Sequence, residues 1–528
     1  MMSEDDISKG DGFVRQAGDM QRYNSTGVRH VRRVGTGIWC SLDMADHDPT
    51  TGRGGACRAV LRAAAAFALL LLAGCAWLRP APAEADLDTP LLLLNEGQAA
   101  TASWPDPAWW RGFGSPELDR LMADATARNL TIAAAVAQLE QADAQLRIAG
   151  AGLLPSLDLS YNRQRQQVTS ATGSSTTRTG RSPTRVFNAN QLTFNGSYEI
   201  DFWGKNRASL EAARQSRLVG AFNLGTVTIT SQASVASTYF ALLGAQEQLA
   251  ILEENIGVAG RVLGVLRARQ AAGTSTGLDV AQQETLLAQL RAQLPPMQQA
   301  VEVNRNALAV LAGRAPAASR AAGGGFSDLT VPAPGPGLTT EVLTRRPDVH
   351  AAEAALAAAN ADIAVARAQL LPSVVLSGDI GWTALTSAAL ISPQTLIFTL
   401  AAGLAQPLFK GGALVGNVQL SEARARELLA NYRLAILSAL QDTDDAAIAL
   451  RQTGLQEAQQ QDAVRTAERA YAISEAQFRA GTIDLLTLLI TQTTLFNARN
   501  LLVSARLARL QAAVGMFRAL GGGWTLPT

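Results

Sequence analysis

The feature that most constrains this chain is the stretch from Leu192 to Phe202, in which apolar and polar side chains alternate. Successive side chains of a β-strand point to opposite faces, so the segment forms a strand with one apolar and one polar face. Its length matches the roughly 9–11 residues with which a tilted strand crosses a bilayer. Trp203 follows Phe202, and aromatic residues line the membrane interfaces of transmembrane barrels. A sandwich strand with one solvated face fits the same pattern, so this stretch alone leaves both interpretations open.

Composition favours long helices and argues against several classes of function. Ala, Leu, Gln and Arg are abundant and aromatic residues make up 5% of the chain, which is typical of helical proteins. A formal net charge of +1 at pH 7 argues against a nucleic-acid partner. His30, His47 and His350 are too scattered for a metal cluster, and the sequence contains no nucleotide-binding loop. We therefore expect neither an enzyme nor a bound metal.

One group of carboxylates is a candidate for acid–base chemistry. It consists of Asp442, Asp444 and Asp445, and Arg451 follows in the same helical pattern. Charge runs of this kind are more often the solvated face of a helix. We interpret the group as such a face.

The N-terminal region carries the marks of an exported lipoprotein. A basic segment that begins at Arg58 precedes an apolar run over 63–72, which is too short to span a membrane as a helix. Leu72-Ala-Gly-Cys75 resembles a bacterial lipobox, so we expect cleavage before Cys75 and a covalent lipid on it; a chance cysteine in an ordinary signal peptide is the alternative. The predicted divisions are a spurious or non-native extension at 1–57, a signal peptide at 58–74 and a lipidated tether at 75–115. The extension is interpreted so because signal peptides do not normally begin some sixty residues into a chain.

The rest of the chain is an internal duplication. Leu153-Leu-Pro-Ser156 recurs at 370–373, each time after an Ala-rich helical pattern, and Ala272-Gly-Thr274 recurs at 480–482. Each copy predicts a helix, two strands, a long helix, a turn and a return helix. The predicted divisions are repeat 1 at 116–322, a linker rich in Gly and Pro at 323–340, and repeat 2 at 341–524.

The strands and helices of the two copies follow from periodicity and caps. Strands are expected near 155–168, 188–203, 373–385 and 395–409. Helices are expected at 116–149, 206–271, 278–313, 412–479 and 484–520, with Ser115 as the first N-cap. The two longest helices would each measure about 100 Å. Gly273 and Gly481 suit the ends of these helices, and Pro295-Pro296 is expected to break the first return helix.

Four amphipathic strands cannot close a barrel, and open sheet edges are not tolerated in lipid. Membrane barrels start at about eight strands, so several chains must pool their strands in a closed ring. Two chains would give eight strands and three would give twelve, and the larger barrel leaves an obvious lumen. We therefore expect a homotrimer that spans a membrane.

The chain resembles the outer membrane efflux proteins, which are TolC-like channels, and among them the OprM- and NodT-type lipoproteins. The motifs that carry the resemblance are Trp109-Trp110 with Phe113, the stretches 197–204, 345–349 and 366–373, and the segment from Ala519 to Trp524.

The resemblance implies a fold and a function. The fold is an α+β membrane protein, a trimeric 12-stranded transmembrane β-barrel with four strands per chain, continued by a long periplasmic α-helical barrel. The function is passive conduction across the outer membrane of a Gram-negative bacterium, in a tripartite efflux system with a periplasmic adaptor and an inner-membrane pump of the RND type. The alternative is an adaptor-like or scaffold lipoprotein without a pore of its own.

The resemblance also assigns roles to particular residues. The turns at Gly273, Thr274, Gly481 and Thr482 would lie farthest from the bilayer and dock the adaptor. Phe202, Trp203 and Phe409 would be aromatic residues at the membrane interface. Thr487, Ile490 and Thr491 would form the periplasmic aperture, where many relatives carry an aspartate in place of Ile490. The alternative is that these residues only pack between helices, which is the commoner role of an apolar isoleucine.

Overall fold

The computed structural model describes residues 105–169, 184–318, 325–332 and 340–525. The predicted signal peptide, Cys75 and most of the tether lie outside these residues. Within them, no helix combines the length and the apolar character that crossing a membrane would require.

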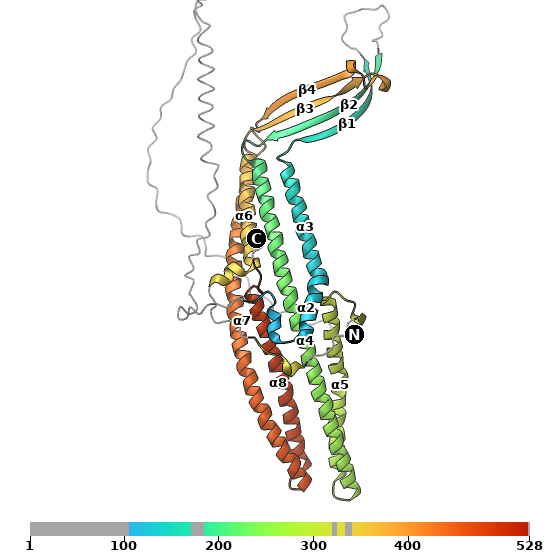
Figure 1. The fold of residues 1–528 in the computed structure, drawn as a ribbon, viewed down its shortest axis with the longest axis vertical. Coiled ribbons are helices and arrows are strands. Elements are labelled where there is room, and N and C mark those ends of the chain that lie inside the picture. The colour runs from blue at the N-terminus through green and yellow to red at the C-terminus, as the bar shows by residue number, and fades with distance from the viewer. Residues whose placement is uncertain (1–104, 170–183, 319–324, 333–339, 526–528) are drawn as a thin grey trace, which may run out of the picture. The chain divides into compact units, whose positions relative to one another are not determined.

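Four antiparallel strands form one sheet in chain order (Figure 1). They are β1 (Ser156–Thr169), β2 (Thr184–Ile200), β3 (Ser373–Ala384) and β4 (Leu396–Ala405). The register places apolar residues opposite one another across the sheet, in rows such as Leu159, Phe194, Ile380 and Phe398. Each of the four predicted strands is therefore present. β2 ends at Ile200 rather than at 203, because Asp201 begins the turn into the next helix.

Two long helices and two return helices form a pair of hairpins at the end of the helices opposite the sheet (Figure 1). The hairpins are α4 (Lys205–Ala271) with α5 (Gly277–Leu311), and α7 (Ala413–Ala480) with α8 (Leu485–Ala519). α4 and α7 contain 67 and 68 residues, so each is about 100 Å long, as predicted. α3 (Leu130–Ala151) packs against α4, and α6 (Pro347–Ala368) packs against both α4 and α7.

The predicted helix at 116–149 is instead two helices, α2 (Pro116–Arg128) and α3. The break falls at Asn129, whose backbone is extended and whose side-chain oxygen accepts hydrogen bonds from the amides of Thr131 and Ile132. An asparagine in this position offers the backbone an alternative to the helix, so the helical pattern restarts after it. At the N-terminus of α2 the predicted cap is confirmed, because Ser115 Oγ accepts from the amide of Leu118.

The predicted break at Pro295-Pro296 is wrong, because α5 is continuous through both prolines. Both prolines are exposed, so the carbonyl groups that lose their intrahelical donors can face water. On the opposite side, Leu290 is buried and Leu294 and Met297 pack against the same apolar cluster. We infer that this packing outweighs the local cost of the prolines.

The two largest apolar clusters each join several helices. The larger one joins α2, α4, α5 and α8 and contains the short helix Trp109–Phe113, with Trp109 stacked on Phe517 at a centroid distance of 5.1 Å. The second lies nearer the hairpin turns and contains residues of α4, α5, α7 and α8, among them Leu263, Leu287 and Leu488. Five residues of α4 recur at every seventh position, a spacing typical of helices that contact neighbouring helices. Val235, Leu242 and Leu263 are buried, and Leu249 and Ile256 are half-buried against the same clusters.

Candidate functional site

The sheet has the two faces that the alternation predicts. Leu157 and Leu159 of β1 and Phe398 and Leu400 of β4 are exposed; the last two are 79% and 82% exposed. The opposite face carries hydroxyl and amide groups, with Ser160 Oγ within 2.9 Å of Thr193 Oγ1. β1 and β4 each leave one edge unpaired within the described residues. An apolar outer face combined with free edges is the arrangement of one segment of a barrel.

The junction between β2 and α4 is fixed by the residues that make its sequence distinctive. Asp201 caps α4, because its carboxylate accepts from the amides of Asn206 at 3.1 Å and Arg207 at 3.0 Å. Burial raises the pKa of Asp201, but these hydrogen bonds outweigh it and hold the pKa below its usual range. Trp203 Nε1 donates to the carbonyl oxygen of Pro372 at 2.7 Å, which ties this junction to the start of β3.

The predicted interface aromatics therefore differ in their surroundings. Trp203 is half-buried and hydrogen-bonded, whereas Phe202 is 65% exposed and Phe409 is 88% exposed. Phe409 lies next to the turn at Gly411 and Gly412, both of which have positive φ. The two exposed rings lie beside the strand ends, and whether lipid surrounds them stays a prediction.

The two hairpin turns share one capping scheme. Gly273 and Gly481 have φ of 73° and 75°, and the amides of Thr274 and Thr482 donate back to Arg269 and Gln477. This is the glycine-terminated helix end that the sequence predicts. The return helices begin with side-chain caps, Thr276 with Asp279 on α5 and Asp484 on α8. The hydrogen bonds from Thr487 hold the pKa of Asp484 below its usual range.

Polar contacts join the first hairpin to the second. Arg269 of α4 donates to the carbonyl oxygens of Phe478 and Arg479 at the end of α7. Arg499 of α8 forms ion pairs with Glu254 of α4 and Glu468 of α7 at 3.2 and 2.9 Å. The hairpins are therefore tied to each other both at the turns and along their length.

The predicted aperture residues lie on α8 just past the second turn. Ile490 is 58% exposed, and its place at an aperture stays a prediction. The hydroxyl of Thr487 donates to Asp484, and that of Thr491 donates to the carbonyl oxygens of Thr487 and Leu488. Both threonine hydroxyls are therefore satisfied within α8, and Ile490 is the apolar, exposed residue of the three. Leu486 is 56% exposed and lies one turn away on the same face of α8.

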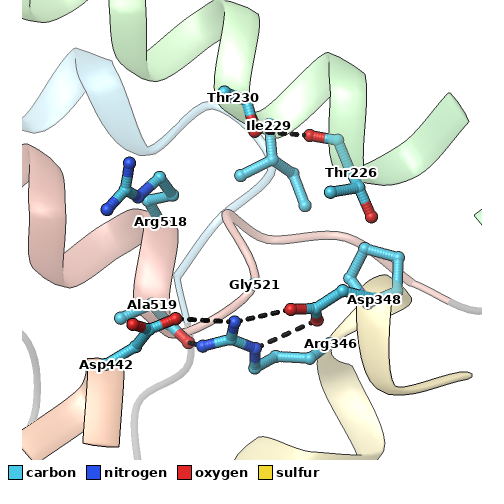
Figure 2. A pocket seen from close by; sticks show the side chains of 10 residues that line it. Thr226, Ile229, Thr230, Arg346, Asp348, Asp442, Arg518, Ala519 and Gly521 are labelled. Atoms are coloured by element: carbon cyan, nitrogen blue, oxygen red, sulfur yellow. Dashed lines mark hydrogen bonds and ion pairs between the residues drawn. The ribbon is translucent and has the colours of Figure 1, made fainter. Parts of the chain in front are cut away.

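A cavity of about 170 Å³ lies where α4, α6, α7 and α8 meet, with Arg346 at its base (Figure 2). Arg346 forms ion pairs with Asp348 at 2.6 Å and Asp442 at 2.9 Å. It also donates to the carbonyl oxygens of Ala519 and Ala439. Burial lowers the pKa of the guanidinium, but the two carboxylates outweigh it and raise the pKa above its usual value.

The role of Arg346 was not predicted from the sequence, where it was noted only within a family motif. Asp442 was interpreted as part of a solvated helix face; its side chain is 52% exposed but is held by Arg346. The sequence Arg346-Pro-Asp348 at the start of α6 contains a signal for this role. The aspartate stabilises the N-terminus of the helix, and the arginine before it can reach a neighbouring helix.

These features together define a class of protein. A sheet with an apolar outer face and two free edges continues directly into two helical hairpins about 100 Å long, which is the design of a membrane channel assembled from several chains.

Comparison with known proteins agrees with this class. The model of the family described as "Outer membrane efflux protein" matches residues 121–314 and 338–522. The pyoverdine export outer membrane protein OpmQ of Pseudomonas aeruginosa is 39% identical over 87% of this chain and 96% of its own length. "Probable outer membrane lipoprotein SilC" of Salmonella typhimurium is 26% identical over 86% of this chain and 97% of its own length.

Solved structures show the same fold. The outer membrane protein VceC of Vibrio cholerae has a TM-score of 0.71 and 26% identity, and the match covers 80% of this chain and all of VceC. The chain belongs to the outer membrane efflux protein family, and it is an efflux channel of the outer membrane. The predicted fold class, that of the TolC-like channels, is confirmed.

Proposed function

We propose that three copies of this chain form one conduit that carries compounds passively through the outer membrane, as the outer component of a tripartite pump. The observation that carries the proposal is the sheet with an apolar outer face and free edges at β1 and β4. Unpaired backbone groups cost several kcal/mol each in lipid, so the free edges need partner strands from further copies. Three sheets of four strands give a closed barrel of twelve.

The helical hairpins are the proposed meeting place with a periplasmic adaptor. Gly273, Thr274, Gly481 and Thr482 are all exposed, and an added Cβ at either glycine would meet nothing within 4 Å. These turns therefore offer backbone that a partner can approach closely. An inner-membrane pump of the RND type would supply the energy, because nothing in a passive conduit does so.

We further propose that a lipid on Cys75 anchors the chain to the outer membrane. The proposal rests on the lipobox-like sequence and on the name of the relative SilC. Mass spectrometry of the mature N-terminus tests it: the expected result is an acylated N-terminal cysteine. An unmodified Cys75, or a mature chain that retains residues 1–74, contradicts the proposal.

The channel function is tested by reconstitution of the purified chain into planar bilayers, with cross-linking in detergent to count subunits. We expect a three-subunit species that conducts ions and that migrates differently on a gel before and after heating. A stable monomer, or a trimer that never conducts while still binding an adaptor, would support the alternative of a scaffold lipoprotein without its own pore.

A further inference from the structure

One row of the sheet carries two carboxylates. The register pairs Asp158 of β1 with Asn195 of β2, Asn195 with Asp379 of β3, and Asp379 with Thr399 of β4. Adjacent strands lie about 4.8 Å apart, so the two carboxylates start about 10 Å from each other along this row. All four side chains project from one face, because residues directly opposite each other in antiparallel strands share a face.

That face is the one opposite to the apolar rows. The next row along the strands consists of Leu159, Phe194, Ile380 and Phe398, which project to the other side of the sheet. In a transmembrane barrel the apolar side meets lipid and the polar side meets the lumen. Asp158 and Asp379 therefore belong to the lumen side.

The charge of these two carboxylates is not neutralised within the described part of the chain. No hydrogen bond or ion pair joins either of them to another described residue, whereas Glu199, on the same face near the helices, is paired with Lys205 at 2.6 Å. The amide of Asn195, between the two aspartates, donates to Ser160 Oγ at 3.0 Å instead. The other described side chains on this face of β1, β2 and β3 are mainly hydroxyls and amides, among them Ser156, Asn162, Gln164, Ser197, Ser377 and Thr383.

We propose that Asp379 and Asp158 set the charge preference of the barrel, so that its lumen concentrates cationic solutes and disfavours anionic ones. The inference rests on the proposed trimer, whose symmetry places three copies of each carboxylate at one level of the lumen. A narrow lumen with low-dielectric walls focuses the field of such groups, and a potential of about one kT changes the local concentration of a monovalent ion about threefold.

Thr399 provides a local probe of this field, because it lies opposite Asp379 and is exposed. In the Thr399→Cys variant, the reaction rates of the new thiol with a cationic and an anionic methanethiosulfonate reagent are compared in outer-membrane vesicles. The chain without this substitution supplies the blank for its native cysteines. The ratio of the two rates reports the local potential and does not depend on the state of the periplasmic aperture.

We expect the thiol to react faster with the cationic reagent than with the anionic one. The ratio of the cationic to the anionic rate should fall at least about fivefold when Asp158→Asn and Asp379→Asn are added, because the potential changes the local concentrations of the two reagents in opposite directions. Asp379→Glu should keep the ratio. Asp445→Asn removes the same charge from an exposed position on α7, about 48 Å along the helix from its start and many screening lengths away, and should also keep it.

The two ways of failing are distinct. Gel migration shows whether the double aspartate variant is an assembled trimer. If it is, and the introduced thiol reacts with both reagents at an unchanged ratio, the proposed charge preference is refuted, whereas the proposed channel is not contradicted. If the introduced thiol reacts with neither reagent in assembled trimers, Thr399 does not face the lumen, and both the inference and the proposed barrel are contradicted.

Discussion

Asn129 and Arg346 occupy equivalent places in the two repeats, and each reaches the end of the return helix of its own repeat. Asn129 Nδ2 donates to the carbonyl oxygen of Leu311 at 2.9 Å, and Arg346 Nη1 donates to that of Ala519 at 3.3 Å. Both residues stand at the N-cap position of the helix that leads to the sheet, α3 in one repeat and α6 in the other. The same contact, from the N-cap residue to the end of the return helix, is therefore present in both repeats. An amide makes it in repeat 1 and a guanidinium makes it in repeat 2.

The glycines that follow the return helices should be intolerant of any side chain. At Gly313 an added Cβ would lie 2.2 Å from the carbonyl oxygen of Arg128, and at Gly521 it would lie 2.4 Å from that of Arg345. Gly273 has a similar φ of 73° but open space around it. We expect Gly313→Ala and Gly521→Ala to lower the thermal unfolding temperature of the trimer well beyond Gly273→Ala, which carries only the backbone strain of about 1–2 kcal/mol. Equal shifts for all three would show that the close contacts do not matter.

Removing the guanidinium of Arg346 should destabilise the region where four helices meet. The Arg346→Met variant leaves Asp348 without its partner. Because the side chain of Asp348 is 39% exposed and water screens its charge, we expect a cost below the roughly 3–5 kcal/mol of a fully buried pair. Arg518→Met is the matched control, because Arg518 lines the same cavity but is exposed. Denaturant unfolding of the detergent-solubilised trimer measures both. A control variant as unstable as Arg346→Met would mean that net charge, not the buried pair, is responsible.

Acid should weaken the ion pair between Arg346 and Asp348. Burial raises the pKa of Asp348, but the hydrogen bonds and charge of Arg346 outweigh it, so the folded pKa lies below the usual range. A lowered folded pKa means that the stabilisation is complete above the unfolded pKa of about 4 and is lost as pH falls through the folded pKa. Thermal unfolding between pH 7 and pH 3 should show this loss in the native chain. Asp348→Asn should flatten that part of the profile, and an unchanged profile would assign the acid sensitivity elsewhere.

The aperture can be tested by charge. If Ile490 lines the narrowest part, Ile490→Asp places three carboxylates there and should raise cation selectivity and sensitivity to divalent cations in bilayer recordings. Gln282→Asp puts the same charge on α5, at the position that the turn repeat makes equivalent, and should leave selectivity unchanged. In the native channel the closed-state conductance should respond little to salt, because no ionised ring at Ile490 needs screening. Unchanged selectivity in an assembled Ile490→Asp trimer would place Ile490 away from the aperture.

The periodic elements of this protein were predictable from its sequence because their causes are local. Alternation fixed which side of β2 is apolar, and Gly273 and Gly481 marked the ends of the long helices through their need for positive φ. The prediction that was wrong rested on a local signal that packing against distant residues outweighs. Pro295 and Pro296 favour a break, yet burial of Leu290 beside them keeps α5 continuous, and no pattern within that segment reveals the neighbouring helices.

Tertiary structure decided which polar groups meet. Asp442 and Arg346 are 96 residues apart, and only the packing of α6 against α7 turns an apparent helix-face charge into one side of an ion pair. The row that contains Asp158 and Asp379 likewise exists only through strand register, since 221 positions separate the two residues in the chain. Periodicity determines which face of an element a side chain occupies, because that depends on neighbours in sequence. What the face meets depends on how distant elements dock, and that docking is set by the packing of the assembled structure.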